Sequence, residues 1–212
     1  KLRCWGSGAN GQLGNETGTT QVAGPDLQTV DLGSTSYPVE VQAMDRNTCV
    51  RFANGGGKCF GSINTVNTST STSGLGDQAG DMGDNLGFAV FPVGTVAEQL
   101  WNSGEGANIC ARLDNDESIC WGSDNYGAFG DEFDSGSKNS TASALSGYVD
   151  LNGDTIVQMA IGKTHSCVLL ENNDVKCFGD NAYGSLGYED STNRGRTSST
   201  MGTNINAVNI SW

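Results

Sequence analysis

Short runs that alternate between apolar and polar residues recur along the chain, and they predict β-strands. Three of them are VEVQA at residues 39–43, VAEQL at 96–100 and IVQMA at 156–160. Period-two alternation over about five residues, bounded by frequent turn signals, is typical of half-buried strands in an all-β fold. No stretch of convincing length has the periodicity of a helix. The pattern therefore predicts an all-β protein built from short strands.

Each of these runs is followed by two cysteines with nine residues between them: CVRFANGGGKC, CARLDNDESIC and CVLLENNDVKC. The middle of each stretch reads as a tight turn. A three-residue hairpin loop needs a left-handed backbone at its last position, which Gly, Asp and Asn tolerate. That position holds Gly55, Asp116 and Asn173. The spacing therefore predicts three β-hairpins.

A hairpin centred on these turns places its two cysteines directly opposite each other. A non-hydrogen-bonded antiparallel pair brings Cα atoms to about 4.5 Å, which a disulfide can bridge. Each bridge would close a loop of about ten residues and stabilise the fold by roughly 2–3 kcal/mol. A zinc site fits poorly, since zinc ligands usually lie two to four residues apart; reduced core cysteines are the other alternative. We expect three disulfides: Cys49–Cys59, Cys110–Cys120 and Cys167–Cys177.

The second cysteine of each pair belongs to a longer repeat that also includes Cys4. Each of these cysteines is followed by an aromatic residue and a glycine, at intervals of 55, 61 and 57 residues. We expect the aromatics to pack in the core or between blades: Trp5, Phe60, Trp121 and Phe178. Tetrads of the form G-x-[LF]-G follow at 11–14, 127–130 and 184–187. In the second unit we match SGLG at 73–76, delayed by a Ser/Thr-rich insertion. Such a period, with several strands in each unit, is typical of propeller blades.

These units resemble the regulator of chromosome condensation repeat. The resemblance rests on THSC at 164–167, the hairpin after it, CFGDN at 177–181 and GSLG at 184–187. The paired cysteines resemble a secreted, cysteine-stapled branch of that family. The family builds seven-bladed β-propellers, so the resemblance implies a single partial propeller domain of about four blades. We expect its units at about 1–38 (incomplete), 39–95, 96–155 and 156–212. Units two and three depart from the pattern, with RNT and ANI in place of THS.

Cys4 is unpaired in this segment, because its expected partner would lie ten residues earlier. We therefore expect the 212 residues to be a piece of a longer chain. The alternatives are a free thiol or an intermolecular disulfide. Four units would also leave an incomplete ring with open strand edges, which proteins normally avoid.

The composition narrows the choice of partners and of compartment. The chain carries 24 acidic and 11 basic residues, a formal net charge of −13. This charge argues against nucleic acid as a partner, because phosphates require basic patches. No apolar run reaches the length of a membrane span. Disulfides favour an extracellular or cell-surface location, where four Asn-x-Ser/Thr sequons become candidate N-glycosylation sites: Asn15, Asn67, Asn139 and Asn209.

The sequence offers little catalytic chemistry, and we expect no enzyme and no cofactor. His165 is the only histidine, and by the resemblance it occupies a packing position before the hairpin cysteine. Calcium is the one metal with candidate oxygen ligands. These are the acidic clusters at 77–84 and 131–134, which include Asp77, Asp81, Asp84, Asp131, Glu132 and Asp134. Neither cluster has the spacing of an EF-hand loop, so solvated loop surface is the simpler interpretation.

These observations favour a non-enzymatic extracellular or cell-surface module, a glycoprotein that forms structure or binds other proteins. Its partners would be other proteins, or further copies of itself, bound through the propeller faces and the open ends. Two alternatives remain at this point. One is an intracellular propeller that regulates a small GTPase, which the family includes, and which would require reduced thiols. The other is the ectodomain of a larger enzyme or receptor. Fold alone does not choose among them.

Overall fold

The regular structure is almost entirely antiparallel β-sheet, as the alternating pattern predicted. The computed structural model describes residues 1–62, 74–104, 108–132, 136–138 and 147–210. Three sheets follow one another along the chain, and their strands are β1 (Pro38–Ala43), β2 (Asn47–Phe52) and β3 (Gly57–Gly61); β4 (Ala97–Asn102), β5 (Ile109–Leu113), β6 (Ser118–Asp124) and β7 (Gly136–Lys138); and β8 (Ile156–Ile161), β9 (His165–Leu170) and β10 (Val175–Gly179). The described helices are single 3₁₀ turns: η1 (Gly83–Asn85), η2 (Ser198–Thr200) and η3 (Gly202–Asn204).

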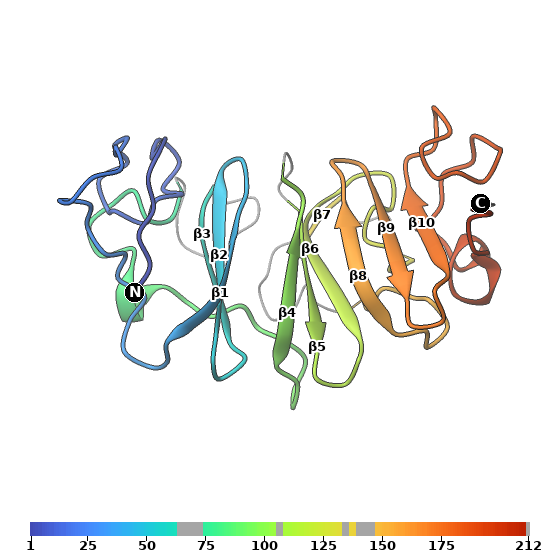
Figure 1. The fold of residues 1–212 in the computed structure, drawn as a ribbon, viewed down its shortest axis with the longest axis horizontal. Coiled ribbons are helices and arrows are strands. Elements are labelled where there is room, and N and C mark those ends of the chain that lie inside the picture. Colours follow the sequence, from blue (N-terminus) through green and yellow to red (C-terminus); the bar gives the residue numbers. More distant parts are fainter. Residues whose placement is uncertain (63–73, 105–107, 133–135, 139–146, 211–212) are drawn as a thin grey trace.

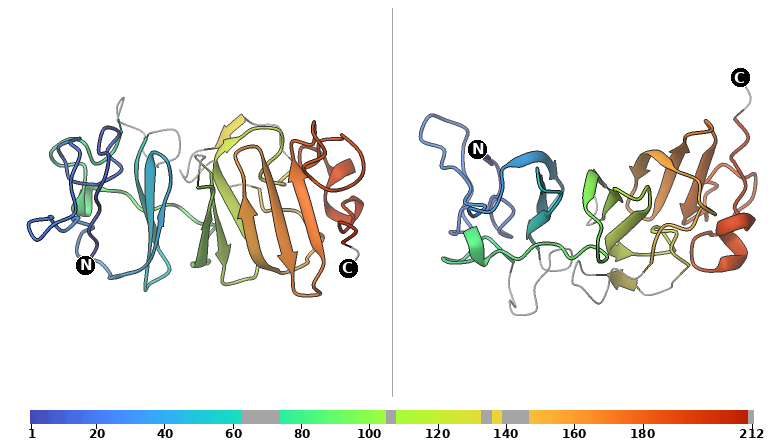
Figure 2. Two further views of the ribbon diagram at one scale, coloured as in Figure 1. Left: turned by 45° about the horizontal axis from the view of Figure 1, so that its top comes forward. Right: turned by 90° about the horizontal axis from the view of Figure 1, so that it is seen from below.

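The sheets lie side by side in chain order and fan out as blades of a partial propeller (Figures 1 and 2). Their first strands β1, β4 and β8 contact one another in sequence and form the inner edge of the arc. The predicted runs at 39–43, 96–100 and 156–160 correspond to these three strands, within two residues at each end. Side chains of β1 join it to β4 by hydrogen bonds to the backbone of β4. The Glu40 carboxylate accepts from Leu100 N at 3.1 Å, and Gln42 Nε2 donates to Leu100 O at 3.0 Å.

The segment at residues 2–6 repeats the backbone bonds of β3, β6 and β10, although it forms no named strand. One outward bond recurs at all four positions, with N···O distances of 2.7–2.9 Å: Val30 N to Leu2 O, Ala89 N to Gly57 O, Val149 N to Ser118 O, and Val208 N to Val175 O. The glycine that ends each segment also recurs in a left-handed conformation, with φ between 109° and 121°: Gly6, Gly61, Gly122 and Gly179. Residues 2–6 therefore occupy the position of a third strand in the first unit.

This register corrects one prediction. The third-strand glycine pairs with a short outer strand in every blade: Gly6 with Gln21, Gly61 with Leu75, Gly122 with Lys138, and Gly179 with Arg194. Leu75 thus takes the place of Gln21 and Arg194, and the SGLG at 73–76 is wrong as the second unit's tetrad. The assignment was wrong because Leu75-Gly76, which belongs to an outer strand, matches the last two residues of the tetrad pattern. Between Gly61 and Leu75 the sequence contains no G-x-[LF]-G tetrad, and residues 63–73 of that stretch lie outside the described residues.

The hydrophobic cores run across the seams between blades. One core joins Val30 and Leu32 of the first unit to Phe52 and Phe60 of the second, and it reaches Trp121 of the third. A second core joins the third blade to the fourth, through residues such as Phe129, Val168 and Phe178. Burial at these seams holds neighbouring blades together, since apolar area removed from water stabilises by about 25 cal/mol/Å².

Candidate interaction surface

Three disulfides fix the hairpins of the complete blades. The structure joins Cys49 to Cys59, Cys110 to Cys120 and Cys167 to Cys177, with Cα–Cα distances of 4.1, 4.0 and 4.1 Å. In each hairpin the two cysteines are register partners across the strands. These are the three pairs that the hairpin geometry predicted. Each blade therefore has its two central strands linked covalently.

The hairpin tips have the predicted turn geometry. Gly55, Asp116 and Asn173 are left-handed, with φ of 78°, 65° and 69°. The residue before each of them is an asparagine whose side-chain oxygen accepts the N–H two residues later, at 2.9–3.2 Å. This side-chain turn is a common way to brace a tight loop. The tips lie at the bottom of Figure 1, at one end of the blades.

The loops at the opposite end of the blades are anchored to the next blade. Thr48 Oγ1 donates to Gln12 O, and Ser166 Oγ donates to Ala128 O, both at 2.8 Å and both buried. The two acceptors are equivalent tetrad positions, so the same inter-blade bond occurs twice. In the third blade Ile109 holds the donor position and has no hydroxyl to offer. Buried bonds of this kind hold loops in one conformation.

A glutamate after the tetrad adds a second link of this type, which the sequence analysis missed. Glu16 Oε1 accepts Gly80 N at 2.9 Å and Met82 N at 3.0 Å, and so joins the first unit to the second. Glu16 is left-handed, as are Glu132 and Glu189 at the equivalent positions two residues after the tetrad glycine. The signal was present in the sequence as the recurrence of Glu at this spacing.

A buried lysine closes the seam between the first and second units. Lys58 Nζ donates to Leu32 O at 3.0 Å and to Gly83 O at 2.9 Å, and it lies 4.7 Å from the ring centre of Phe88. Burial lowers the pKa of this ammonium, although the carboxylates of Asp84 and Asp31 act in the opposite direction. The amino group therefore serves the fold as a hydrogen-bond donor, away from solvent.

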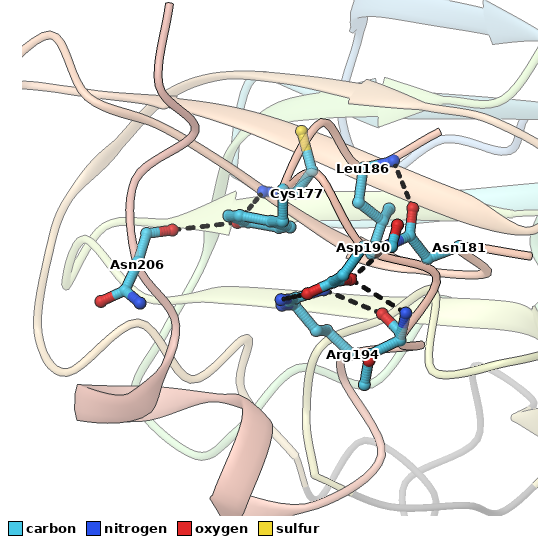
Figure 3. A network of polar contacts seen from close by, with 8 residues as sticks. Cys177, Asn181, Leu186, Asp190, Arg194 and Asn206 are labelled. Carbon is cyan, nitrogen blue, oxygen red and sulfur yellow. Dashed lines mark hydrogen bonds and ion pairs between the residues drawn. The ribbon is translucent and has the colours of Figure 1, made fainter. Parts of the chain in front are cut away.

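The loop after β10 is braced by a compact polar network (Figure 3). Arg194 binds both oxygens of Asp190, with N···O distances of 2.8 and 3.0 Å. The buried Asn181 donates to Asp190 Oδ1 at 2.9 Å and accepts Leu186 N at 2.9 Å. The hydrogen bonds from Arg194 hold the pKa of the Asp190 carboxyl well below its ordinary value.

Tyr188 extends this network to the end of the chain. Its hydroxyl accepts Cys177 N at 3.0 Å and donates to Asn206 O at 2.9 Å (Figure 3). The Arg194 guanidinium lies 3.9 Å from the centre of its ring, within the range of a cation–π contact. Desolvation raises the pKa of this phenol. The outer loop, the hairpin and residue 206 are thus held as one unit.

Two tyrosines project from these braced loops at equivalent positions. Tyr126 and Tyr183 each precede the first glycine of a tetrad, and both are exposed. The side chain of Tyr183 is 97% exposed, and Tyr126 faces the Arg196 guanidinium at 5.5 Å. Tyrosine is enriched at protein interfaces because it offers a large rigid contact with a polar tip. We refer to the end of the blades that carries these loops as the tetrad-loop face.

An apolar groove separates residues 2–13 from β1. It measures about 360 Å³ and is lined by residues of both sides, among them Leu2, Cys4, Trp5, Leu13, Val41 and Met44. Among the described residues, Cys4 is the one cysteine outside a disulfide, and burial raises the pKa of its thiol. Phe60, Trp121 and Phe178 are buried, but Trp5 is 63% exposed along this groove. The prediction that this aromatic packs in the core or between blades was wrong for Trp5, because no described residue occupies the strand position that would cover it.

The remaining candidate residues are dispersed. His165 begins β9 opposite Gly179 and is half-buried. Asp81 Oδ2 accepts Gly76 N and Gln78 N, while Asp84 Oδ1 accepts Ser34 N, so both carboxylates serve the backbone. Within the described residues no group of three or more metal-ligating side chains occurs. Asp134 lies outside those residues.

The sequons also differ in their surroundings. Asn209 is exposed, whereas Asn15 is half-buried and its Nδ2 donates to Thr19 O at 2.9 Å. Asn67 and Asn139 lie outside the described residues. A search of the described part of the chain found no helix long and apolar enough to cross a membrane.

Comparisons with known proteins agree with this architecture. Residues 156–185 match the family model of the regulator of chromosome condensation (RCC1) repeat. No curated protein matches the chain by sequence. Among solved structures, Prp20p from Saccharomyces cerevisiae, studied for its binding to Gsp1p and histones, superposes with a TM-score of 0.59 at 18% identity over 89% of this chain. Human WBSCR16 gives 0.60 at 16% over 91%, and yeast RCC1 (Prp20) bound by Kap60 gives 0.57 at 18% over 92%.

The likeness concerns the fold, because identity is low throughout. The chain spans less than half of these proteins, 43%, 45% and 44% of their lengths respectively. Its fold is therefore that of consecutive blades of an RCC1-like β-propeller.

Proposed function

We propose that this chain is a non-enzymatic protein-interaction module of an extracellular or cell-surface propeller. One disulfide in each of the three complete blades carries this proposal. Disulfides of this density persist in oxidising compartments and are rare in the cytosol. We further propose that the four units at 1–38, 39–95, 96–155 and 156–212 form one domain.

The tetrad-loop face is the surface that we assign to a partner. Two of its loops are held by buried inter-blade bonds, and the loop that carries Tyr183 is held by the network of Asn181, Asp190 and Arg194, so little conformational entropy is lost on binding. Tyr126 and Tyr183 project from it as exposed anchors. With a formal charge of −13, the module favours a neutral or cationic protein and disfavours nucleic acid.

The compartment is tested by counting thiols in protein taken from its natural source, with alkylation at the moment of lysis. The extracellular proposal predicts that the six hairpin cysteines are alkylated only after reduction. Seven free thiols would overturn it. Enzymatic removal of N-glycans, followed by intact mass, tests Asn15, Asn67, Asn139 and Asn209 in the same sample.

The face is tested by site-specific photo-crosslinking in cell-surface or secreted fractions. A photoreactive residue at Tyr183 should capture a defined partner. Val93 is a matched control, because it is 105% exposed and lies before β4, near the hairpin tips. Equal capture at both positions would refute the assignment to the tetrad-loop face.

A small-GTPase regulator is the second candidate, because the similar yeast protein Prp20p was studied for its binding to Gsp1p. Direct titration of Gsp1p against the oxidised chain distinguishes the two. We expect no saturable binding. Saturable binding, together with free thiols in cells, would support the intracellular candidate.

A further inference from the structure

We propose that Asn152 is a site of spontaneous chemical modification, at which the side-chain amide is converted to aspartate and isoaspartate. The sequence holds three Asn-Gly pairs, which begin at Asn10, Asn54 and Asn152. Glycine has no Cβ and leaves the backbone nitrogen after the asparagine uncrowded, so all three pairs are equally reactive by sequence. The folded structure separates them, because it protects two pairs and leaves the third open. This inference goes beyond the proposed interaction function and does not depend on it.

The reaction is an intramolecular attack followed by hydrolysis. The backbone nitrogen of the glycine attacks Cγ of the asparagine, and a new C–N bond closes a succinimide ring. The side-chain NH₂ group takes up the proton of the glycine N–H through solvent and leaves as ammonia. Water then opens the ring at either carbonyl carbon, which yields aspartate or isoaspartate. Water is the only co-reactant, and the first step requires a glycine nitrogen that is free to attack.

Hydrogen bonds and packing protect Asn54 at the tip of the second blade's hairpin. Gly55 N donates to Phe52 O at 2.9 Å. The side-chain oxygen of Asn54 accepts Gly56 N at 3.2 Å. A methyl group at Gly55 would overlap the side chain of Val96, so this turn packs directly against the third unit. Both the attacking nitrogen and the amide are therefore held in place.

The pair that begins at Asn10 is protected in the same two ways. Gly11 is buried, and its N–H donates to Gly8 O at 2.9 Å. A methyl group at Gly11 would overlap the backbone of Leu75 in the second blade. This glycine nitrogen is therefore both hydrogen-bonded and shielded by a neighbouring blade.

The turn at Asn152 lacks both kinds of protection. Asn152 and Gly153 are exposed and left-handed, with φ of 61° and 84°, and they lie in a tight turn before β8. Within the described residues, Gly153 N has no hydrogen-bond acceptor and the Asn152 side-chain amide has no partner. A methyl group at Gly153 would meet no described atom within 4 Å beyond its chain neighbours. The bond that closes the turn, from Asp154 N to Leu151 O, is long at 3.4 Å, so the turn opens easily.

The expected selectivity follows from the hydrogen bond that a protected glycine must lose. Its nitrogen can attack only after the N–H has left its acceptor. An ordinary backbone hydrogen bond lowers the population with a free nitrogen by roughly five- to tenfold. Packing against a neighbouring blade adds to this protection. We therefore expect Asn152 to react about tenfold faster than Asn54 in the folded protein.

The modification weakens a contact between this turn and the fourth blade. Asp154 Oδ2 lies 2.8 Å from Lys176 Nζ of β10, and the Lys176 side chain is only 11% exposed. Isoaspartate at position 152 adds a methylene to the backbone two residues before Asp154 and moves that carboxylate away from the ammonium. A mostly buried charge that loses its partner destabilises the fold. The isoaspartyl form should therefore unfold at a lower urea concentration than the unmodified chain.

The experiment ages the folded, oxidised chain in mildly alkaline buffer and follows each asparagine by peptide mapping at acidic pH. Isoaspartate is counted by enzymatic methylation. The control is the same chain, reduced and unfolded in urea, in which the three pairs should react at similar rates. Equal rates at Asn152 and Asn54 in the folded chain, or a faster reaction at Asn54, would overturn the proposal.

Asn152→Gln tests the link to stability. It keeps an amide in the turn but closes the larger ring much more slowly. Isoaspartate should be lost at this position, and the urea midpoint should stay constant during ageing. An equal fall of the midpoint in this variant and in the unchanged chain would refute the effect on the contact between Asp154 and Lys176.

Val93→Asn is a matched test of what selects the site. Val93 and Gly94 occupy the equivalent turn before β4, closed by a bond from Thr95 N to Pro92 O at 3.0 Å. Val93 is 105% exposed, and a methyl group at Gly94 would also meet no described atom within 4 Å beyond its chain neighbours. The substitution should create a second fast site while Asn54 stays protected. Protection of this position as strong as that of Asn54 would show that exposure does not select the site.

Discussion

Removing the disulfide of the third blade should destabilise the protein more than removing that of the fourth. Both bridges close loops of the same length, with a sequence separation of 10. In the chain-entropy model each loop contributes about 2.7 kcal/mol. The two bridges differ in burial. Cys110 and Cys120 are completely buried within the core between the third and fourth blades, whereas Cys167 is half-buried.

Burial of the sulfur atoms adds a second contribution to the stability that is lost when a disulfide is removed. Replacing a buried sulfur by hydrogen loses about 1 kcal/mol of apolar transfer free energy. We therefore expect C110A/C120A to lower the free energy of unfolding by roughly 4 to 5 kcal/mol. We expect C167A/C177A to lower it by roughly 1 kcal/mol less.

The assay is urea unfolding followed by tryptophan fluorescence, in a Cys4→Ser background that prevents thiol exchange. The midpoint and slope give the free energy of unfolding for each variant. Equal losses in the two double variants would show that sulfur burial does not contribute. Losses below about 1 kcal/mol in both would show that the hairpins are closed before folding and that the loop-closure argument is wrong.

Three further predictions follow from single contacts. Thr48→Val leaves Gln12 O buried without its donor, so urea unfolding should report a loss of about 1 to 3 kcal/mol; an unchanged midpoint would mean that water replaces the hydroxyl. Arg194 holds the pKa of Asp190 in the folded protein below the value of about 3.9 expected in the unfolded chain. The Asp190 carboxylate therefore stabilises the fold above about pH 3.9, and this stabilisation is lost as the pH falls through its pKa in the folded protein. Carboxyl NMR should show Asp190 titrating below the ordinary value of about 3.9, and Arg194→Gln should raise its pKa, because the hydrogen bond from Arg194 is the largest cause of the shift. Burial raises the pKa of Cys4, so its alkylation rate should keep rising above the midpoint of a model thiol near 8.5; a midpoint at or below that value would contradict the buried position.

The sequence by itself determined the three hairpins and their disulfides, because both depend on residues that lie close together in the chain. Alternating residues predicted β1, β4 and β8, and a left-handed last turn residue predicted three tips, which the structure places at Gly55, Asp116 and Asn173. The spacing of nine residues then led to the cysteine pairs. Each hairpin and its disulfide involve only about ten consecutive residues, so the local pattern of residue types is sufficient to predict them.

Contacts between distant residues were decided only by the tertiary structure. SGLG at 73–76 was wrongly assigned as a tetrad because the place of Leu75 in the blade depends on its pairing with Gly61, which a local residue pattern does not show. The bond between Thr48 and Gln12 spans 36 residues, and the one between Glu16 and Met82 spans 66. Long-range partners of this kind depend on how one blade packs on the next, which no local pattern specifies.

Exposure is the second property that only the tertiary structure decided. Trp5 shares its sequence position with Phe60 and Phe178, yet it is exposed while they are buried. A side chain is buried only when a neighbouring strand covers it. The groove beside Cys4 is explained in the same way. The repeat determines the conformation of residues 2–6, and the strands that pack beside these residues determine which of their side chains are exposed.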